Sequence, residues 1–146
     1  MKFVSFSLML VLFLSACTGT DENLPHQELD LRETSKALQE SISDYGNGIF
    51  LYDNGTGSTL VVLNGSVVDV NAKKAPYYEN IDFEVRESTL WISFTEHFEI
   101  NYSHKELNNQ LIYRINRNEF KESFDTIKVL KNEKEIPITS VISGEF

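Results

Sequence analysis

The sequence predicts a mainly β domain, built as an antiparallel sandwich or a small barrel of about eight strands with one N-terminal helix. From residue 49 onward, apolar and polar residues alternate in most of the candidate strands, as in strands that bury one face and expose the other. Turn residues divide these runs at intervals of roughly ten residues, a spacing typical of sandwiches and small barrels. Residues 28–45 instead carry apolar residues at helical spacing.

The first 16 residues have the layout of a secretory signal. Lys2 precedes an apolar run from Phe3 to Leu14, which is too short for a membrane-spanning helix because that takes roughly 20 apolar residues. The run ends in LSAC at positions 14–17, a tetrapeptide that resembles the lipobox of bacterial lipoproteins. The resemblance implies cleavage before Cys17, a diacylglyceryl thioether on the Cys17 sulfur and acylation of the freed amine. Two or three acyl chains suffice for stable anchoring, so we expect Cys17 to attach the chain to the membrane.

The remaining residues divide into a tether and one domain. Residues 17–27 are mostly polar and predict a flexible, lipid-anchored tether. Residues 28–146 predict a single β-rich domain that begins with a helix over residues 28–45, whose apolar side chains share one helical face. They are Leu31, Leu38, Ile42 and Tyr45. The glycines at positions 46 and 48 then end the helix.

A hairpin signature follows the predicted helix. Residues 53–57, with the sequence DNGTG, lie between two apolar runs and favour a tight turn. A calcium loop is the alternative, but an EF-hand loop needs ligands over twelve residues ending in a bidentate Glu, and residues 58–61 are Ser, Thr, Leu and Val. We therefore prefer the turn.

The alternation is most regular between residues 81 and 102. We expect Phe83, Val85, Ile92 and Phe94 to be core residues, and Pro137 predicts that the last strand lies at a sheet edge. Residues 72–80 and 103–110 are predicted loops. The predicted strands are 49–52, 59–63, 67–70, 81–86, 89–95, 97–102, 111–116, 126–130 and 136–142.

Composition excludes several classes of function. Cys17 is the one cysteine of the chain, so the rest of the domain has no thiol for catalysis, metal binding or a disulfide. Without the signal, 12 basic residues face 22 acidic ones, a net charge of −10 that repels phosphate backbones and disfavours nucleic-acid binding. Few Ala and many Asn, Lys and Ile suggest an AT-rich Gram-positive genome. Together with the anchor expected at Cys17, this favours the outer face of a Gram-positive cell membrane as the location.

The sequence predicts no metal site, no cofactor and no known hydrolase motif. His97 and His104 are seven residues apart, so on a continuous strand they would point to opposite faces, and His26 lies in the predicted tether. Motifs such as GxSxG, SxxK and HExxH are missing from the sequence. We therefore expect no enzymatic activity.

One segment stands out as a candidate partner-binding site. Lys73, Lys74, Tyr77 and Tyr78 form a cationic and aromatic stretch in a predicted loop, and Trp91 lies on the polar side of its strand. Exposed tyrosines beside lysines are typical of protein-binding surfaces. In the alternative interpretation, which we favour, both tyrosines cover the end of the sheet and the lysines provide solubility.

The sequence therefore favours a lipid-anchored, extracytoplasmic binding or accessory module. Its expected partners are the membrane, through the lipid on Cys17, and an envelope protein. A structural component of an envelope or spore, or a prophage-encoded surface protein, is the alternative. An enzyme such as a folding catalyst is the third class, although the paired His and Cys pattern expected of parvulin-type prolyl isomerases is missing.

Overall fold

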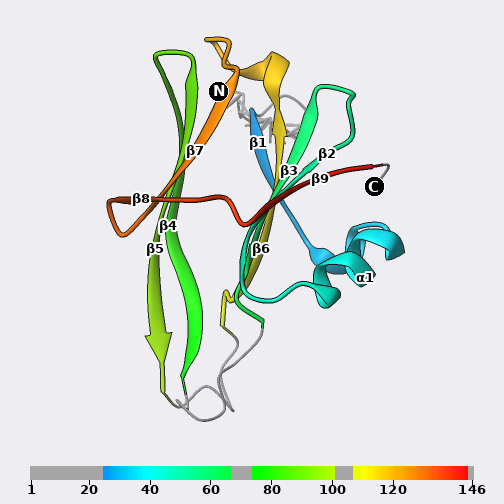
Figure 1. Cartoon of the computed structure of the whole chain (residues 1–146), viewed down its shortest axis with the longest axis vertical. Coiled ribbons are helices and arrows are strands. Elements are labelled where there is room, and N and C mark those ends of the chain that lie inside the picture. The colour runs from blue at the N-terminus through cyan, green and yellow to red at the C-terminus, as the bar shows by residue number, and fades with distance from the viewer. Residues whose placement is uncertain (1–24, 67–73, 101–106, 145–146) are drawn as a thin grey trace, which may run out of the picture.

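The computed structural model describes residues 25–66, 74–100 and 107–144, and within them the chain is mainly β, with nine strands in two mixed sheets (Figure 1). The described strands form two separate sheets, so the small barrel is wrong. One sheet contains β1 (His26–Leu29), β2 (Gly48–Asp53), β3 (Ser58–Asn64), β6 (Gln110–Asn116) and β9 (Ser140–Ser143). The other contains β4 (Ala75–Arg86), β5 (Thr89–Glu99), β7 (Thr126–Lys131) and β8 (Lys134–Ile136).

The five-stranded sheet has the strand order β1-β6-β3-β2-β9. The predicted hairpin is confirmed, because β2 and β3 pair antiparallel. In its turn, the side chains of Asp53 and Asn54 accept hydrogen bonds from the backbone N–H groups of Gly55 and Thr56, at 2.9 and 3.0 Å. Gly55 and Gly57 take φ values of 70° and 85°, which a residue with a side chain rarely adopts. Side chains of the turn residues therefore stabilise the backbone conformation of the turn.

The four-stranded sheet has the order β4-β5-β7-β8 and contains the longest strands. β4 and β5 form a hairpin with a bulge between Glu79 and Asp82. The expectation of purely antiparallel sheets is wrong, because β5 pairs with β7 in parallel and β2 pairs with β9 in parallel. Between β5 and β7 the chain crosses to the other sheet as β6, so it returns in the same direction as β5.

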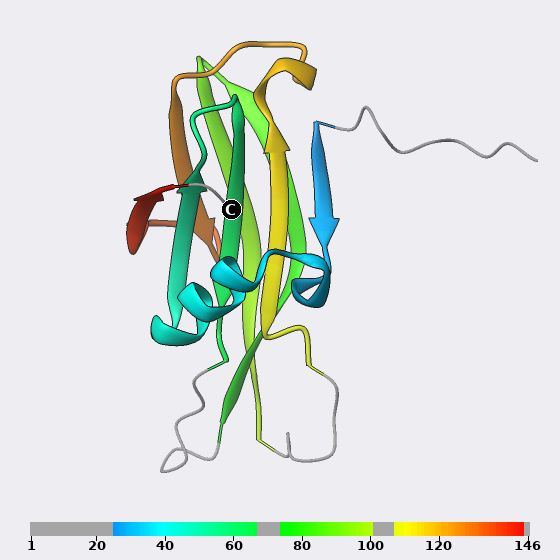
Figure 2. The ribbon, with the colours of Figure 1, turned by 90° about the vertical axis from the view of Figure 1, so that its right-hand side faces the viewer.

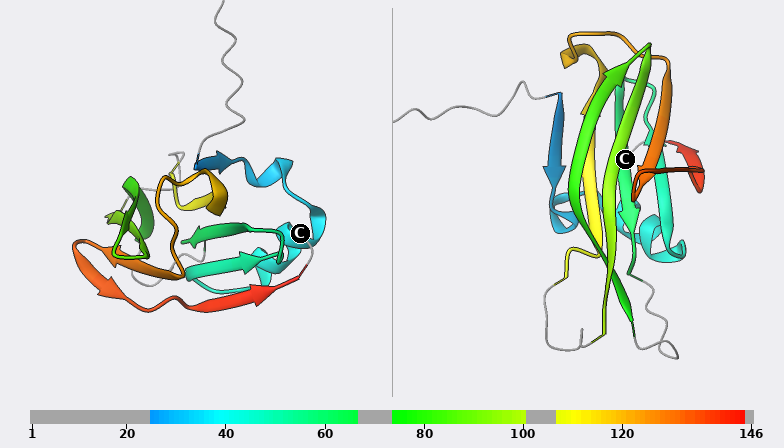
Figure 3. Two further views of the ribbon diagram at one scale, coloured as in Figure 1. Left: turned by 90° about the horizontal axis from the view of Figure 1, so that it is seen from above. Right: turned by 90° about the vertical axis from the view of Figure 1, so that its left-hand side faces the viewer.

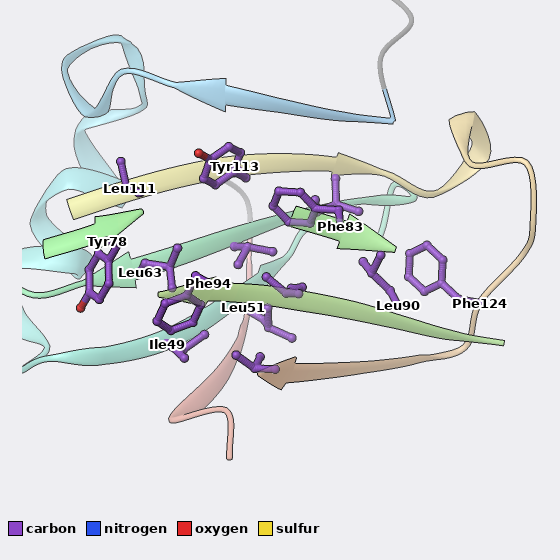
Figure 4. Close-up of a cluster of buried hydrophobic side chains, with 14 residues drawn as sticks. Ile49, Leu51, Leu63, Tyr78, Phe83, Leu90, Phe94, Leu111, Tyr113 and Phe124 are labelled. Atoms are coloured by element: carbon purple, nitrogen blue, oxygen red, sulfur yellow. The ribbon is translucent and has the colours of Figure 1, made fainter. Parts of the chain in front are cut away.

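The two sheets share one hydrophobic core (Figure 4). Phe83, Ile92 and Phe94 are buried in it and Val85 packs against it, as the alternation predicts. From the five-stranded sheet, Ile49, Leu51, Val61, Leu63, Leu111, Tyr113 and Ile115 contribute to the same cluster. Burial of both inner faces therefore holds the sheets together.

A second, smaller core lies under the helix α1 (Lys36–Asp44), which covers the outer face of the five-stranded sheet (Figure 2). Leu38 and Ile42 of α1 pack on Phe50, Tyr52, Val62 and Ile112. Seen along the long axis, the helix, the five-stranded sheet and the four-stranded sheet form successive layers (Figure 3). The segment from β8 to β9 connects the four-stranded sheet to the five-stranded sheet along one side of the molecule.

The predicted helix over 28–45 is too long at its N-terminus. Residues 26–29 form β1, antiparallel to β6, and residues 31–33 form a 3-10 turn, η1 (Leu31–Glu33). The Ser35 hydroxyl accepts a hydrogen bond from the Leu38 backbone at 3.2 Å, so the helix begins after Ser35. Pairing with β6 satisfies the backbone hydrogen-bonding groups of residues 26–29. The helical spacing of apolar residues in the sequence does not reveal this pairing. The end of the predicted tether is therefore part of the sheet.

Two further boundaries differ from the prediction. The predicted strand 136–142 is interrupted at Pro137, because β8 ends at Ile136 and β9 begins at Ser140. Both strands lie at the edge of their sheets, as the proline predicts. The predicted loop 72–80 contains the start of β4. The signal, Cys17 and the predicted strand 67–70 lie outside the described residues. Among the described helices, none has the length and apolar character that crossing a membrane requires.

Candidate functional site

The residues singled out from the sequence do not form one loop surface. Lys73 lies outside the described residues, and Lys74 is exposed directly before β4. Tyr77 and Tyr78 are consecutive in β4, so their side chains point to opposite faces of the sheet. The described part of the expected loop from Ala75 onward is therefore a strand, since Tyr77 and Tyr78 pair with β5. The lysines and Pro76 gave this segment the composition of a loop.

Tyr78 points into the core. Only 4% of its surface is exposed, and its ring packs edge-on against Phe94 with centroids 5.4 Å apart. Its backbone N–H donates to the carbonyl of Asn108 at 2.9 Å. Burial, and then the nearby negative charge of Glu96, raise the pKa of the Tyr78 hydroxyl above its ordinary value. This tyrosine covers the end of the core, as the alternative interpretation has it.

Tyr77 and Trp91 lie on the outer face of the four-stranded sheet, apart from each other. The Tyr77 ring stacks on His97, with centroids 5.3 Å apart, and Lys128 lies over the Trp91 ring at 5.1 Å. Trp91 and His97 are six positions apart on β5, roughly 20 Å at the rise of a strand. The two aromatic side chains therefore do not form a single contact surface.

A cleft that the sequence analysis did not predict opens between the sheets, where β4 begins and β5 ends. Its volume is about 580 Å³, within the range of roughly 300–1,000 Å³ that is usual for small-molecule sites. Three aromatic side chains and three charged ones line it, together with neighbouring residues of β2, β8 and the segment before β9. The lining residues are Asn47, Gly48, Ile49, Lys74, Pro76, Tyr78, Phe94, Glu96, Phe98, Lys131, Ile136, Pro137 and Thr139.

The cleft exists because the facing strands differ in length. β4 and β5 have 12 and 11 residues, whereas the strands of the other sheet have between 4 and 7. Figure 1 shows the β4–β5 ribbon running past the end of the five-stranded sheet. Phe98 lies in this overhang in phase with Phe94 on β5, yet 57% of its surface is exposed while Phe94 is buried. The apolar face of the ribbon therefore continues beyond the sheet that covers it.

A half-buried ion pair forms one wall of the cleft. The Lys131 ammonium lies 2.9 Å from the Glu96 carboxylate, with side-chain exposures of 34% and 17%. The side chain of Asn132 fixes the backbone of Glu96, since its oxygen accepts from the Glu96 N–H at 2.8 Å and its amide donates to the Glu96 carbonyl at 3.3 Å. The turn between β7 and β8 therefore holds Glu96 in place.

Lys74 carries the remaining charge of the cleft. It is exposed at the rim, and no acidic side chain of the described ranges lies within ion-pair distance of its ammonium. Within the same ranges, no group of three or more His, Cys, Asp or Glu residues could hold a metal ion. The chemistry that this arrangement offers is non-covalent: aromatic walls for an apolar body and ammonium groups for an anion.

Comparison with known proteins adds no relative to this geometry. No protein-family model matches the chain, and neither a curated protein nor a solved structure is similar to it. The cleft and the sequence motif at Cys17 are therefore the features from which a function can be inferred.

Of the cleft residues that the sequence analysis did not single out, one signal in the sequence points to Phe98, and none points to the pair formed by Glu96 and Lys131. Phe98 continues the alternation of Ile92 and Phe94 four residues beyond the last buried position. An apolar period that outlasts the neighbouring strands predicts an uncovered apolar face. Recognising it requires knowing which strands lie opposite, and the pairing of Glu96 with Lys131 spans 35 residues of sequence.

Proposed function

We propose that this chain is a lipid-anchored, extracytoplasmic binding module that takes up a small ligand at the open end of its core. The two sheets are assigned as a β-sandwich, and the lipobox-like LSAC at positions 14–17 supports a lipid anchor on Cys17. The observation that carries the binding role is the cleft between the sheets, with its aromatic wall and its fixed ion pair. Its function in the envelope would be to bind and present, or to sense, that ligand.

A binding role accounts for the contrast between exposed and fixed groups in the cleft. Phe98 is left largely in water, which costs the apo protein apolar contact that a ligand would supply. Glu96 and Lys131 are instead held in one arrangement by Asn132 and by each other. Preorganised polar groups beside an unfilled apolar wall are what a ligand site requires.

The anchor is tested on the protein from its native cell. We expect the N-terminal peptide of the mature chain to begin at Cys17 and to carry acyl chains, as measured by mass spectrometry. Cys17→Ser should abolish both the modification and the cleavage. Wild-type protein with an unmodified Cys17, free in the culture medium, would contradict the anchor.

The binding role is tested with a neutral aromatic probe, 4-phenylbutan-1-ol. Calorimetric titration of the full chain in zwitterionic nanodiscs, with empty nanodiscs as the reference, should show saturable binding. Phe98→Ala should weaken it about tenfold, because loss of an aromatic contact surface costs on the order of 1–2 kcal/mol. Val141→Ala is the matched control, since Val141 is 62% exposed and lies on β9 outside the cleft. Equal binding by both variants would exclude the cleft as the site.

A further inference from the structure

The three charged side chains of the cleft, Lys74, Glu96 and Lys131, have a net positive charge in an acidic protein. Lys131 and Glu96 neutralise each other at 2.9 Å, so among the described residues of the cleft the Lys74 ammonium is the charge without a partner. The whole chain has a formal net charge of −9. A cation held at the rim of an apolar cleft, against the charge of the rest of the molecule, favours a ligand with a negative group.

The aromatic side chains of the cleft define the other half of the ligand. Phe94 is buried at the inner end, Tyr78 packs edge-on against it, and Phe98 is exposed at the outer end. The aromatic wall thus extends from the core to solvent beside Lys74. A ligand that covers Phe98 would leave any polar end at the rim, where it can meet the ammonium.

We propose that the cleft selects a small amphipathic anion, with an aromatic or aliphatic body on Phe94, Phe98 and Tyr78 and its acidic group on Lys74. This ligand class rests on the proposed binding function. A free small molecule is the occupant that the cleft volume of about 580 Å³ fits. The Lys131–Glu96 pair is neutral as a unit, so an acidic group gains no net attraction at the inner end and is drawn to Lys74 at the rim.

The test compares three probes that share one apolar body: 4-phenylbutyrate, 4-phenylbutan-1-ol and 4-phenylbutylamine. They are titrated by calorimetry into the full chain in zwitterionic nanodiscs, with empty nanodiscs subtracted. We expect the carboxylate to bind about three- to tenfold more tightly than the alcohol, the gain of a partly solvated ion pair. The amine should bind more weakly than the alcohol.

Charge-matched variants assign that preference to one residue. Lys74→Gln should bring the ratio of the carboxylate affinity to the alcohol affinity to about one. Lys128→Gln removes the same charge from the outer face of the four-stranded sheet, where Lys128 pairs with Glu135, and should preserve the ratio. If both variants bound the carboxylate and the alcohol equally well, the role of Lys74 would be overturned.

The two proposals fail in different ways. Equal affinity for carboxylate and alcohol in the wild type would overturn the ligand class and leave the cleft as a binding site. Tighter binding of the amine would overturn it too and assign the selectivity to Glu96. Absence of binding by all three probes would overturn the binding function together with the ligand class.

Discussion

The two ends of the inter-sheet core are closed in different ways, and the difference distinguishes aromatic residues that stabilise the fold from those of the proposed binding site. At one end, the segment between β6 and β7 contributes Phe120 and Phe124, packed edge-on with centroids 5.4 Å apart, and the Arg117 guanidinium lies over the Phe124 ring at 5.1 Å. At the other end, Tyr78 is the last buried ring and Phe98 is largely exposed. Figure 4 shows Phe124 and Tyr78 at opposite ends of the cluster.

The closed end has a covering connection and the open end has an overhang. Phe124 is only 8% exposed because a chain segment with η3 (Arg117–Glu119) crosses the end of the core. At the open end, β4 and β5 instead extend beyond the sheet opposite them. An aromatic residue therefore stabilises the fold at one end and remains available to a ligand at the other.

The largest expected effect comes from removing an aromatic side chain at each end. Phe124→Ala should lower the free energy of unfolding by about 3–5 kcal/mol, because it leaves a cavity in the core. Phe98→Ala should lower it by less than about 1 kcal/mol, since most of its surface is already in water. Urea denaturation measures both. A loss at Phe98 as large as that at Phe124 would show that the two ends are equivalent.

The adjacent tyrosines of β4 sharpen the comparison within one strand. Tyr78→Ala should cost about 3 kcal/mol of stability, since the side chain is buried against Phe94. Tyr77→Ala should cost less than about 1 kcal/mol, because Tyr77 stacks on His97 at the sheet surface. Thermal and urea melts of the two variants decide the matter. Equal losses would contradict the assignment of the tyrosines to opposite faces.

Close packing at Gly65 gives a smaller effect at the open end. A Cβ atom there would lie 2.8 Å from both the Tyr78 hydroxyl and the Pro76 ring, and 3.0 Å from the Asn109 carbonyl oxygen. Gly65→Ala should therefore cost about 1–3 kcal/mol of stability through overpacking. Gly46→Ala is the control, because nothing lies within 4 Å of its Cβ position. Equal melting temperatures for these variants would show that β4 and the residue 65 turn can separate freely.

The sequence predicted the parts of the fold that depend on local patterns. Alternation placed Phe83, Ile92 and Phe94 in the core, and the DNGTG turn placed the first hairpin. Local patterns do not contain the partner of a strand, so the parallel pairing of β5 with β7 was missed. The cleft was missed for the same reason, because it depends on the length of β5 relative to strands from other parts of the chain. Composition misled where Pro76 stands in a strand and where the last two residues of the predicted tether, 26 and 27, pair with β6.

Alkaline titration should weaken the core through its tyrosines. Burial raises the pKa of Tyr78 and of Tyr113, whose hydroxyl also donates to Glu28 at 3.1 Å. The unfolded chain loses these protons first, so stability is complete below about pH 10 and falls as the pH rises further. The slope for each group cannot exceed about 1.4 kcal/mol per pH unit, the value for the release of one proton. Urea melts should show a shallower slope for Tyr78→Phe combined with Tyr113→Phe. An unchanged slope would assign the alkaline loss to other groups.

The smallest expected effect is optical and separates the cleft from the outer face. Trp91 is the single tryptophan of the chain and lies on the outer face beneath Lys128, so 4-phenylbutyrate in the cleft should leave its emission unchanged. Phe98→Trp places a second indole at the open end, and its emission should shift by several nanometres as the probe replaces water. Lys128→Gln should alter the Trp91 emission alone, because it removes the cation from that ring. A ligand-dependent change in the wild-type emission would place the binding surface on the outer face of the four-stranded sheet, where Tyr77 and Trp91 lie.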